Sequence, residues 1–220
     1  MSRHDTLATF EAGANGSPTG PGRLERAAPL AGVLFAVAFG IGLLSSGDTP
    51  AVDAPGSEVI AHYEDSGPVF AGIAAAGLGA VLLVFFAGVL RDRLRQTGPE
   101  WLATVVFGGG GVCATGIGIF GMIQFALIDA AELGQPEVAQ TLNIVDNDNF
   151  LPVIAGMAVM LLATGWHTLT SRALPTWLGW VSLVLGIVAV AGPAGFVAFM
   201  LFPVWVLVVA VVLFRQPAGS

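Results

Sequence analysis

One uncharged stretch constrains this chain more than any other feature, because residues 101–128 contain no Asp, Glu, Lys or Arg. At a rise of about 1.5 Å per residue, a helix over this stretch is longer than the ~30 Å hydrocarbon layer of a bilayer. An ionised side chain at the centre of a bilayer costs about 3 kcal/mol or more, so a crossing segment is expected to lack charge. The stretch is therefore predicted to be a transmembrane helix.

Small residues in the same stretch indicate how this helix packs. Gly110, Ala114 and Gly118 recur at every fourth position, and Gly121 belongs to a neighbouring stripe. Small residues at this spacing let helix backbones approach closely within a membrane. We therefore expect the central helix of a bundle. The run of four glycines at 108–111 lowers helix propensity by about 1 kcal/mol each relative to alanine, which predicts a local kink or unwinding there.

The composition extends this interpretation to the whole chain. Hydrophobic residues make up 55% of the sequence and charged residues 10%, whereas a soluble domain carries roughly a quarter charged residues. The net charge of −7 and the absence of lysine argue against nucleic acid as a partner. The lipid bilayer is the partner that this composition predicts.

Polar segments and turns divide the chain into six predicted spans. A disordered cytoplasmic tail is expected over residues 1–23, a transmembrane domain over 24–215 and a C-terminal tail over 216–220. Glycine and proline near position 193 split the last uncharged run into spans five and six, and Pro203 is expected to kink the sixth. The predicted spans are approximately 27–45, 68–90, 101–128, 150–170, 176–191 and 196–214.

Two of the polar connections contain short amphipathic patterns. After span one, Val59, Ile60 and Tyr63 share one face of a predicted helix. After span three, Pro136 suits the first turn of a second helix. The predicted fold is therefore an all-α membrane protein, a six-transmembrane-helix bundle with two short extracytoplasmic surface helices.

Arginine positions predict the orientation. Arginines occur in the N-terminal tail, in the 91–95 and 171–175 loops and at Arg215, whereas the other connections carry acids without arginine. Basic loops stay on the cytoplasmic side of a membrane. We therefore expect a multi-pass protein of the plasma membrane with both termini cytoplasmic.

Two apparent nucleotide motifs fail on context. Residues 116–121 match G-x-G-x-x-G, but the flanking residues are those of a membrane span and do not form a strand-to-helix turn in water. The glycine run at 108–111 lacks the lysine that a phosphate loop requires. No catalytic arrangement of Ser, His and Asp is evident, so the sequence predicts no enzyme, no cofactor and no defined metal site.

Five polar residues are candidates for a pathway or a contact surface. Gln124 lies at the outer end of the third span, close to Asp129. The Asp-Asn-Asp-Asn run that contains Asp146 and Asp148 resembles the opening of a calcium loop, but the next two residues are apolar where that loop needs an oxygen ligand and a glycine. His62 is the only histidine among the acidic outer connections. A weak divalent-cation or proton-responsive patch stays open as an alternative.

Two segments resemble a known family. The sequences LRDRLR at Leu90–Arg95 and LPTWLGW at Leu174–Trp180 are similar to segments of an actinobacterial multi-pass membrane protein family of unknown function. The resemblance covers roughly residues 25–214. It implies about six helices in the plasma membrane and supplies no activity or ligand.

The sequence therefore predicts an integral membrane protein with a structural, accessory or sensing role. The acidic extracytoplasmic loops would form its contact surface, for another membrane protein or for a second copy of the chain. The alternative is a small transporter or channel with a pathway beside the glycine-rich third span. A polar cavity that reaches mid-bilayer would favour transport, whereas a dry, close-packed centre would argue against it.

Overall fold

A computed structural model describes residues 27–45 and 49–216. Residues 1–23 of the predicted tail and residues 217–220 lie outside this described part, which contains helices and no strand. The helices are α3 (Leu30–Ser45), α4 (Gly56–Tyr63), α5 (Ser66–Arg95), α6 (Glu100–Glu132), α7 (Pro136–Asp148), α8 (Leu151–Ser171), α9 (Thr176–Ala189) and α10 (Gly195–Arg215), with a short 3-10 turn, η1 (Gly192–Ala194).

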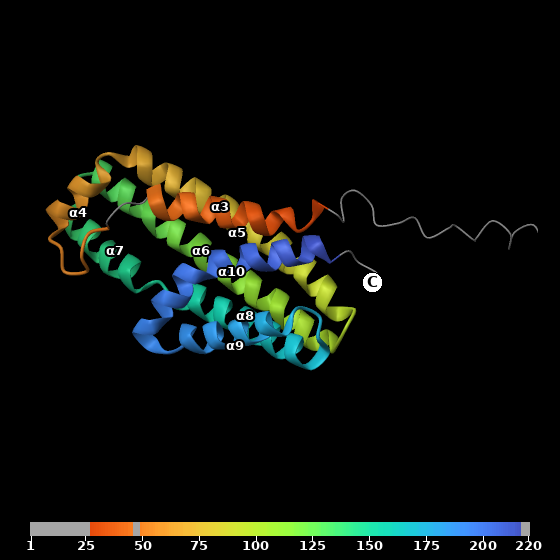
Figure 1. Ribbon diagram of the computed structural model, residues 1–220. Coiled ribbons are helices and arrows are strands. Elements are labelled where there is room, and N and C mark those ends of the chain that lie inside the picture. The colour runs from red at the N-terminus through yellow and green to blue at the C-terminus, as the bar shows by residue number, and fades with distance from the viewer. Residues whose placement is uncertain (1–26, 46–48, 217–220) are drawn as a thin grey trace, which may run out of the picture.

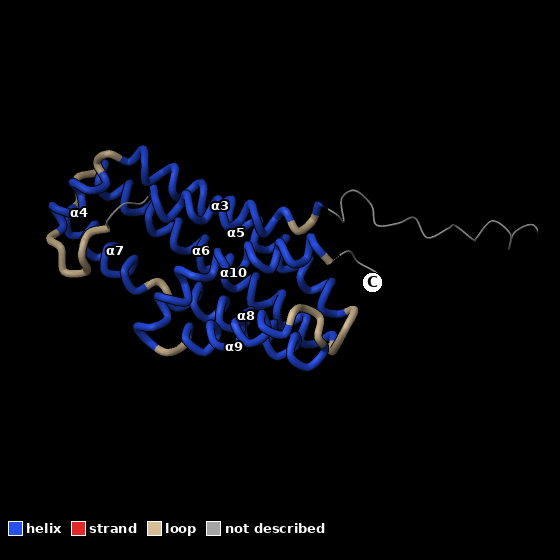
Figure 2. The backbone as a smooth tube through the Cα atoms, in the orientation of Figure 1, coloured by secondary structure: helices blue, strands red, loops and turns tan. Residues whose placement is uncertain are grey.

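The long helices run alongside one another, and the loops gather towards the two ends of the bundle (Figures 1 and 2). Helix α6 packs against α5 on one side and α8 on the other. Helix α3 packs on α5, α9 packs on α8, and α10 contacts both α3 and α9. The glycine-rich helix is therefore central, as its small residues predicted.

The two ends of the bundle differ in chemistry. At the arginine end lie the loops that follow α5 and α8, together with the end of α10 and its Arg215. Helices α4 and α7 pack on each other and on α6 at the opposite end, which we call the capped end (Figure 1). Tryptophan is enriched where proteins meet the membrane–water interface. Four exposed tryptophans occupy the arginine end, namely Trp101, Trp166, Trp177 and Trp180.

Four helical stretches are long and apolar enough to cross a membrane: Ser66–Arg95, Glu100–Glu132, Pro136–Ser171 and Gly192–Arg215. The apolar helices α3 and α9 are shorter, with 16 and 14 residues. The count of six spans, the kink at Pro203 and the location of α4 and α7 on a membrane surface stay predictions.

Helix α6 is continuous through all four glycines at 108–111, so the predicted unwinding is wrong. Its 33 residues give a length of about 50 Å, well beyond the ~30 Å of a hydrocarbon layer. The extra length lies at the capped end, where α6 reaches past the nearby ends of α8, α9 and α10 (Figure 1). This extension supports α4 and α7.

The closest approach inside the bundle is between α6 and α8. A Cβ atom added to Gly156 would lie 2.7 Å from the carbonyl oxygen of Gly109, and it would also meet the backbone nitrogen of Cys113. One turn further along α6, a Cβ on Gly116 would lie 2.7 Å from the backbone nitrogen of Val153. Glycine is required here because any larger side chain would separate the two backbones.

The predicted packing residues divide between other faces of α6. A Cβ on Gly110 would lie 2.6 Å from the Ala87 side chain of α5, and Ala114 is buried. Gly121 faces Ile73 at 3.3 Å. Gly118 is exposed with no atom within 4 Å of its added Cβ, so its predicted packing role is wrong within this chain. Each step of four residues turns a helical stripe by about 40°, which carries Gly118 away from the contact that Gly110 makes.

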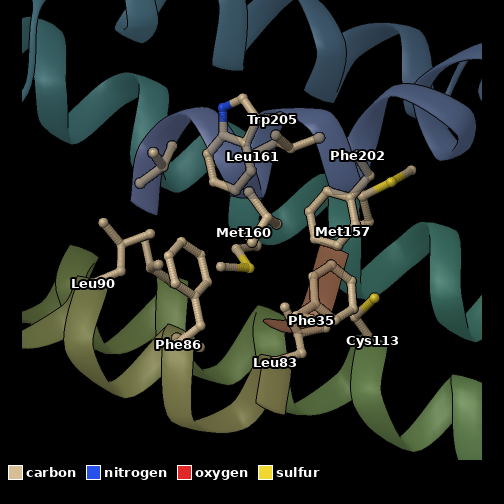
Figure 3. Packing of buried hydrophobic residues seen from close by; sticks show 14 of the residues in the cluster. Phe35, Leu83, Phe86, Leu90, Cys113, Met157, Met160, Leu161, Phe202 and Trp205 are labelled. Carbon is tan, nitrogen blue, oxygen red and sulfur yellow. The ribbon is translucent and has the colours of Figure 1, made fainter. Parts of the chain in front are cut away.

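Large apolar side chains fill the interior between α3, α5, α8 and α10 (Figure 3). Leu83, Phe86, Met157 and Met160 are fully buried there. Phe35 of α3 meets the Phe202 ring edge-on, with 5.9 Å between ring centroids. This half of the bundle, towards the arginine end, is closely packed and mostly apolar, and the buried polar side chains within it are Thr164, His167, Thr168 and Ser182.

Candidate functional site

A pocket of about 250 Å³ opens in the half of the bundle nearer the capped end. Its lining comes from α3, α5, α6 and α10 and from the start of α8, together with residues of the segments that precede α4 and α8. Phe39 of α3 packs edge-on against Phe199 of α10, with 5.4 Å between ring centroids, and both rings form part of the pocket wall. The lining residues are Phe39, Gly42, Leu43, Thr49, Gly72, Ile73, Ala76, Ile117, Phe120, Gly121, Gln124, Asn149, Phe150, Val153, Phe196, Phe199 and Met200.

Residue size explains why space remains at this place. The walls from α5 and α6 contain Gly72, Ala76 and Gly121. The bundle interior nearer the arginine end is instead filled by phenylalanine, leucine and methionine side chains. Leu43 and Phe196 line the pocket and are also exposed, by 38% and 57%. The mouth between α3 and α10 is therefore bordered by apolar side chains.

Polar groups in the wall come from three residues. Gln124 is almost completely buried, with 2% of its surface exposed. The Nδ2 atom of Asn149 is buried and has no hydrogen-bond partner in the described part of the chain. Thr49 adds a hydroxyl group from the segment between α3 and α4. Among the described residues that line the pocket, none is charged.

A buried carboxylate lies behind Gln124. Asp146 of α7 is 3% exposed, and the Gln124 side chain lies beside its carboxyl group. Its Oδ1 atom has no hydrogen-bond partner among the described residues. The hydroxyl of Tyr63, on α4, is also buried and without a described partner. Burial raises the pKa of the Tyr63 phenol, and the neighbouring Asp146 carboxylate adds to the rise in this pKa.

The capped end is held over the pocket by side-chain amides and by one close backbone contact. Asn143 is fully buried and donates a hydrogen bond from Nδ2 to the carbonyl oxygen of Ala51, at 2.8 Å. Asn147 donates to the carbonyl oxygen of Asn143, at 2.9 Å. Gly56, at the start of α4, lies so close to Pro136 that an added Cβ would meet the Pro136 carbonyl group. These contacts fix α4, α7 and the segment before α4 as one unit.

The five predicted contact residues lie in three different environments. Gln124 and Asp146 come together in the buried wall, although they are 22 positions apart in sequence. Asp129 and Asp148 are exposed on the surface. His62 is half-buried, and its ring contacts Tyr63 with 4.9 Å between centroids. The predicted acidic contact surface therefore loses Asp146, which points inwards.

Sequence reasoning missed Tyr63, Asn143 and Asn149 as parts of this site. The sequence pattern places Tyr63 only on the apolar face of a surface helix, together with Val59 and Ile60. Asn143 follows Ala139 by four positions, and both are fully buried on the inner face of α7. The buried face of α7 consists of Ala139, Asn143 and Asp146, while Val138 and Val145 are exposed, so apolar periodicity alone gives no signal for it.

The comparisons with known proteins identify no class for this chain, so the class is described from the fold and the pocket. No family model, no curated protein and no solved structure matches the chain. Over residues 27–45 and 49–216 the fold is all-helical, with four helical stretches long and apolar enough to cross a membrane. Its most distinctive feature is a largely apolar pocket beside the glycine-rich helix.

Proposed function

We propose that this chain is an integral membrane protein that binds one small lipophilic molecule and acts as a sensing or accessory component without catalysing a reaction. The observation that carries the proposal is the 250 Å³ pocket, which has aromatic and aliphatic walls, few polar groups and an apolar mouth. A cavity of about 150 Å³ holds benzene in another protein, so this volume suits about ten non-hydrogen atoms. Lipid tails around the bundle would reach the mouth between α3 and α10 from the side.

Filling the pocket tests this proposal. Ala76→Phe places an aromatic ring in the pocket wall and should reduce binding of a ten-carbon chain at least tenfold, because the ring takes the space of the ligand. Ala74→Phe is the matched control, since Ala74 is on the same helix, exposed and outside the pocket lining. Native mass spectrometry of the purified protein with decane and decan-1-ol measures one-to-one adducts. Equal binding by both variants would contradict the proposal.

The second candidate is a small transporter or channel. The observation in its favour is that the pocket borders Gly121 and Gln124, beside the third span where a pathway was expected. The close-packed side chains around Phe86 and Met160 argue against a continuous pathway towards the arginine end. We expect liposomes that contain the protein to conduct ions no better than protein-free liposomes. An ion current that Ala76→Phe abolishes would favour the channel instead.

We propose that the arginine end faces the cytoplasm and the capped end faces outwards, in the plasma membrane. The five described arginines lie at one end of the bundle, while the connections at the other end carry acids. This separation supports the orientation. The exposed acids of α4, α6 and α7 would then form the surface for another membrane protein or a second copy.

Cysteine labelling tests the orientation with a matched pair of exposed glutamines. Gln96 lies at the arginine end and Gln140 lies on α7 at the capped end. Cys113, the single native cysteine, is fully buried and can be changed to alanine to give a clean background. A membrane-impermeant maleimide on intact cells should label Gln140→Cys and leave Gln96→Cys unlabelled. The reverse pattern would overturn the proposed orientation.

A further inference from the structure

We propose that the pocket selects an uncharged single-chain lipid whose head group is a hydroxyl, such as a long-chain alcohol. This inference rests on the proposed function, because it assumes that the pocket holds a lipophilic molecule. It assigns the chemistry of the head group from the buried polar atoms in the wall, and it assigns Asp146 as a positioning residue behind them.

The first step concerns the Gln124 amide. A carboxylate can only accept hydrogen bonds, so the NH2 group of Gln124 is the part of the amide that can donate to the neighbouring Asp146. The carbonyl oxygen of Gln124 is then the atom left for a ligand in the pocket that Gln124 lines. At this point the wall offers a hydrogen-bond acceptor, and a ligand that donates a hydrogen bond fits it.

The second step concerns Asn149. Its side chain lines the same pocket, and its Nδ2 atom is buried without a hydrogen-bond partner among the described residues. A buried N–H group without a partner costs free energy that a ligand oxygen would recover. The wall therefore offers one acceptor and one donor, and a hydroxyl group is the smallest head that satisfies both.

The third step uses charge to exclude other heads. None of the described lining residues carries a positive charge, and the Asp146 carboxylate lies directly behind Gln124. A carboxylate or phosphate head would be repelled by Asp146 and would find no cation to neutralise it. An ammonium head would be attracted by the same charge, but it would lose its hydration in a pocket whose described lining contains no carboxylate to pair with it. The neutral hydroxyl fits best.

The position of these polar atoms also suits a lipid. Asn149 and Phe150 immediately precede α8, and Phe196 lies near the start of α10, so the pocket lies at the level where these two helices begin. A head group near this level would let its chain lie along the apolar walls of the pocket and leave beside the partly exposed Leu43. About ten non-hydrogen atoms would lie inside, and a longer tail would extend into the bilayer.

Four ligands with the same ten-carbon chain test the inference at pH 8: decan-1-ol, decane, decanoate and decylammonium. Native mass spectrometry of the full-length protein counts the bound molecules. Each hydrogen bond changes binding by about twofold to tenfold, so decan-1-ol should bind about tenfold or more tightly than decane or decanoate. Equal binding of decan-1-ol and decane, with both lost in Ala76→Phe, would overturn the head-group inference while leaving the proposed function intact. Failure of all four ligands to bind would overturn both.

Variants of the two amides locate the recognition. Asn149→Leu removes a donor that makes no bond of its own, so it should weaken decan-1-ol about fivefold and leave decane unchanged. Gln124→Leu should weaken decan-1-ol at least as much, and Gln140→Leu, at an exposed glutamine of α7, is the matched control. If decylammonium bound most tightly and lost this advantage in Asp146→Asn, the head group would be cationic and the inference would be overturned. Unchanged binding of decan-1-ol in both amide variants would also overturn it.

Discussion

Replacing Gly156 by alanine is expected to destabilise the bundle strongly, while the same change at Gly118 is expected to leave it intact or slightly more stable. The added Cβ at position 156 would lie 2.7 Å from the carbonyl oxygen of Gly109 and would press on the backbone of Cys113. Both obstacles are main-chain atoms of α6, which cannot rotate away as a side chain can. Helices α6 and α8 would therefore have to separate.

The expected cost is about 3 kcal/mol or more, at the upper end of what overpacking costs in protein cores. For a chain of this length, such a loss lowers the melting temperature by roughly 6–12 °C. Gly118 has no neighbour within 4 Å, so alanine there adds only helix propensity, worth up to about 1 kcal/mol. Thermal unfolding of the two variants in the same detergent makes the comparison.

Gly108 and Gly111 serve as second controls, because both also face open space within the same helix. All three control variants should retain or raise the melting temperature. If Gly156→Ala melted within a degree of Gly118→Ala, the close approach of α6 and α8 would be wrong. Gly156→Leu should then also be tolerated, whereas the structure leads us to expect no folded protein from it.

The contrast between these glycines shows how far the sequence could predict the packing. A stripe of small residues indicates that some face of α6 approaches another helix closely, and Gly110 and Gly121 do lie against side chains of α5. Spacing alone does not say which glycine is decisive, because this depends on the partner. Here the partner is Gly156, which is 47 positions after Gly109 and lay outside the recognised stripes.

Helix positions were easier to predict than helix ends. Every predicted span has a helix in the structure, because a charge-free run fixes where a membrane helix can lie. The ends of α5 and α6 extend beyond the predicted limits, to Arg95 and Glu132, because helical hydrogen bonding continues into residues that carry charge. Composition marks the limit of the apolar part and carries no signal for the last turn of the helix.

The candidate site was only partly predictable for a related reason. Gln124 was recognised because an amide in a span is unusual, and Asp146 was named as part of an acidic run. That Asp146 turns inwards towards Gln124 follows from the contact of α7 with both α4 and α6. The inward face of a short amphipathic helix depends on what it packs against, and hydrophobic periodicity alone had placed both short helices on a membrane surface.

Gly56→Ala should open the capped end while leaving the rest of the bundle folded. The added Cβ would meet the carbonyl group of Pro136, with its carbon atom at 2.6 Å, so α4 and α7 could no longer lie at their present distance. The buried residues of this end form their own cluster around Tyr63, Leu127 and Ala139, separate from the cluster that fills the bundle interior. The damage should therefore stay local.

Overpacking of this kind costs about 1–3 kcal/mol, which corresponds to roughly a fivefold to 150-fold increase in local opening. Hydrogen–deuterium exchange should become faster by about this factor over residues 54–65 and 136–149, and should stay unchanged in the interior of α6 and α8. Gly67→Ala is the matched control, because its added Cβ would meet only an Asp65 oxygen at an ordinary 3.7 Å. Faster exchange across the whole bundle would contradict a separable cap.

The Gly56→Ala variant also tests whether the capped end, formed by α4 and α7, holds the polar residues of the pocket in place. Thr49 and Asn149 line the pocket from segments that the cap holds in place, through the bonds of Asn143 and Asn147 to the chain before α4. Opening the cap should therefore reduce the preference for decan-1-ol over decane, because the polar atoms lose their fixed positions while the apolar walls remain. If this preference survived in Gly56→Ala although exchange showed the cap open, the head group would be recognised by Gln124 alone, and Asn149 would have no part in it.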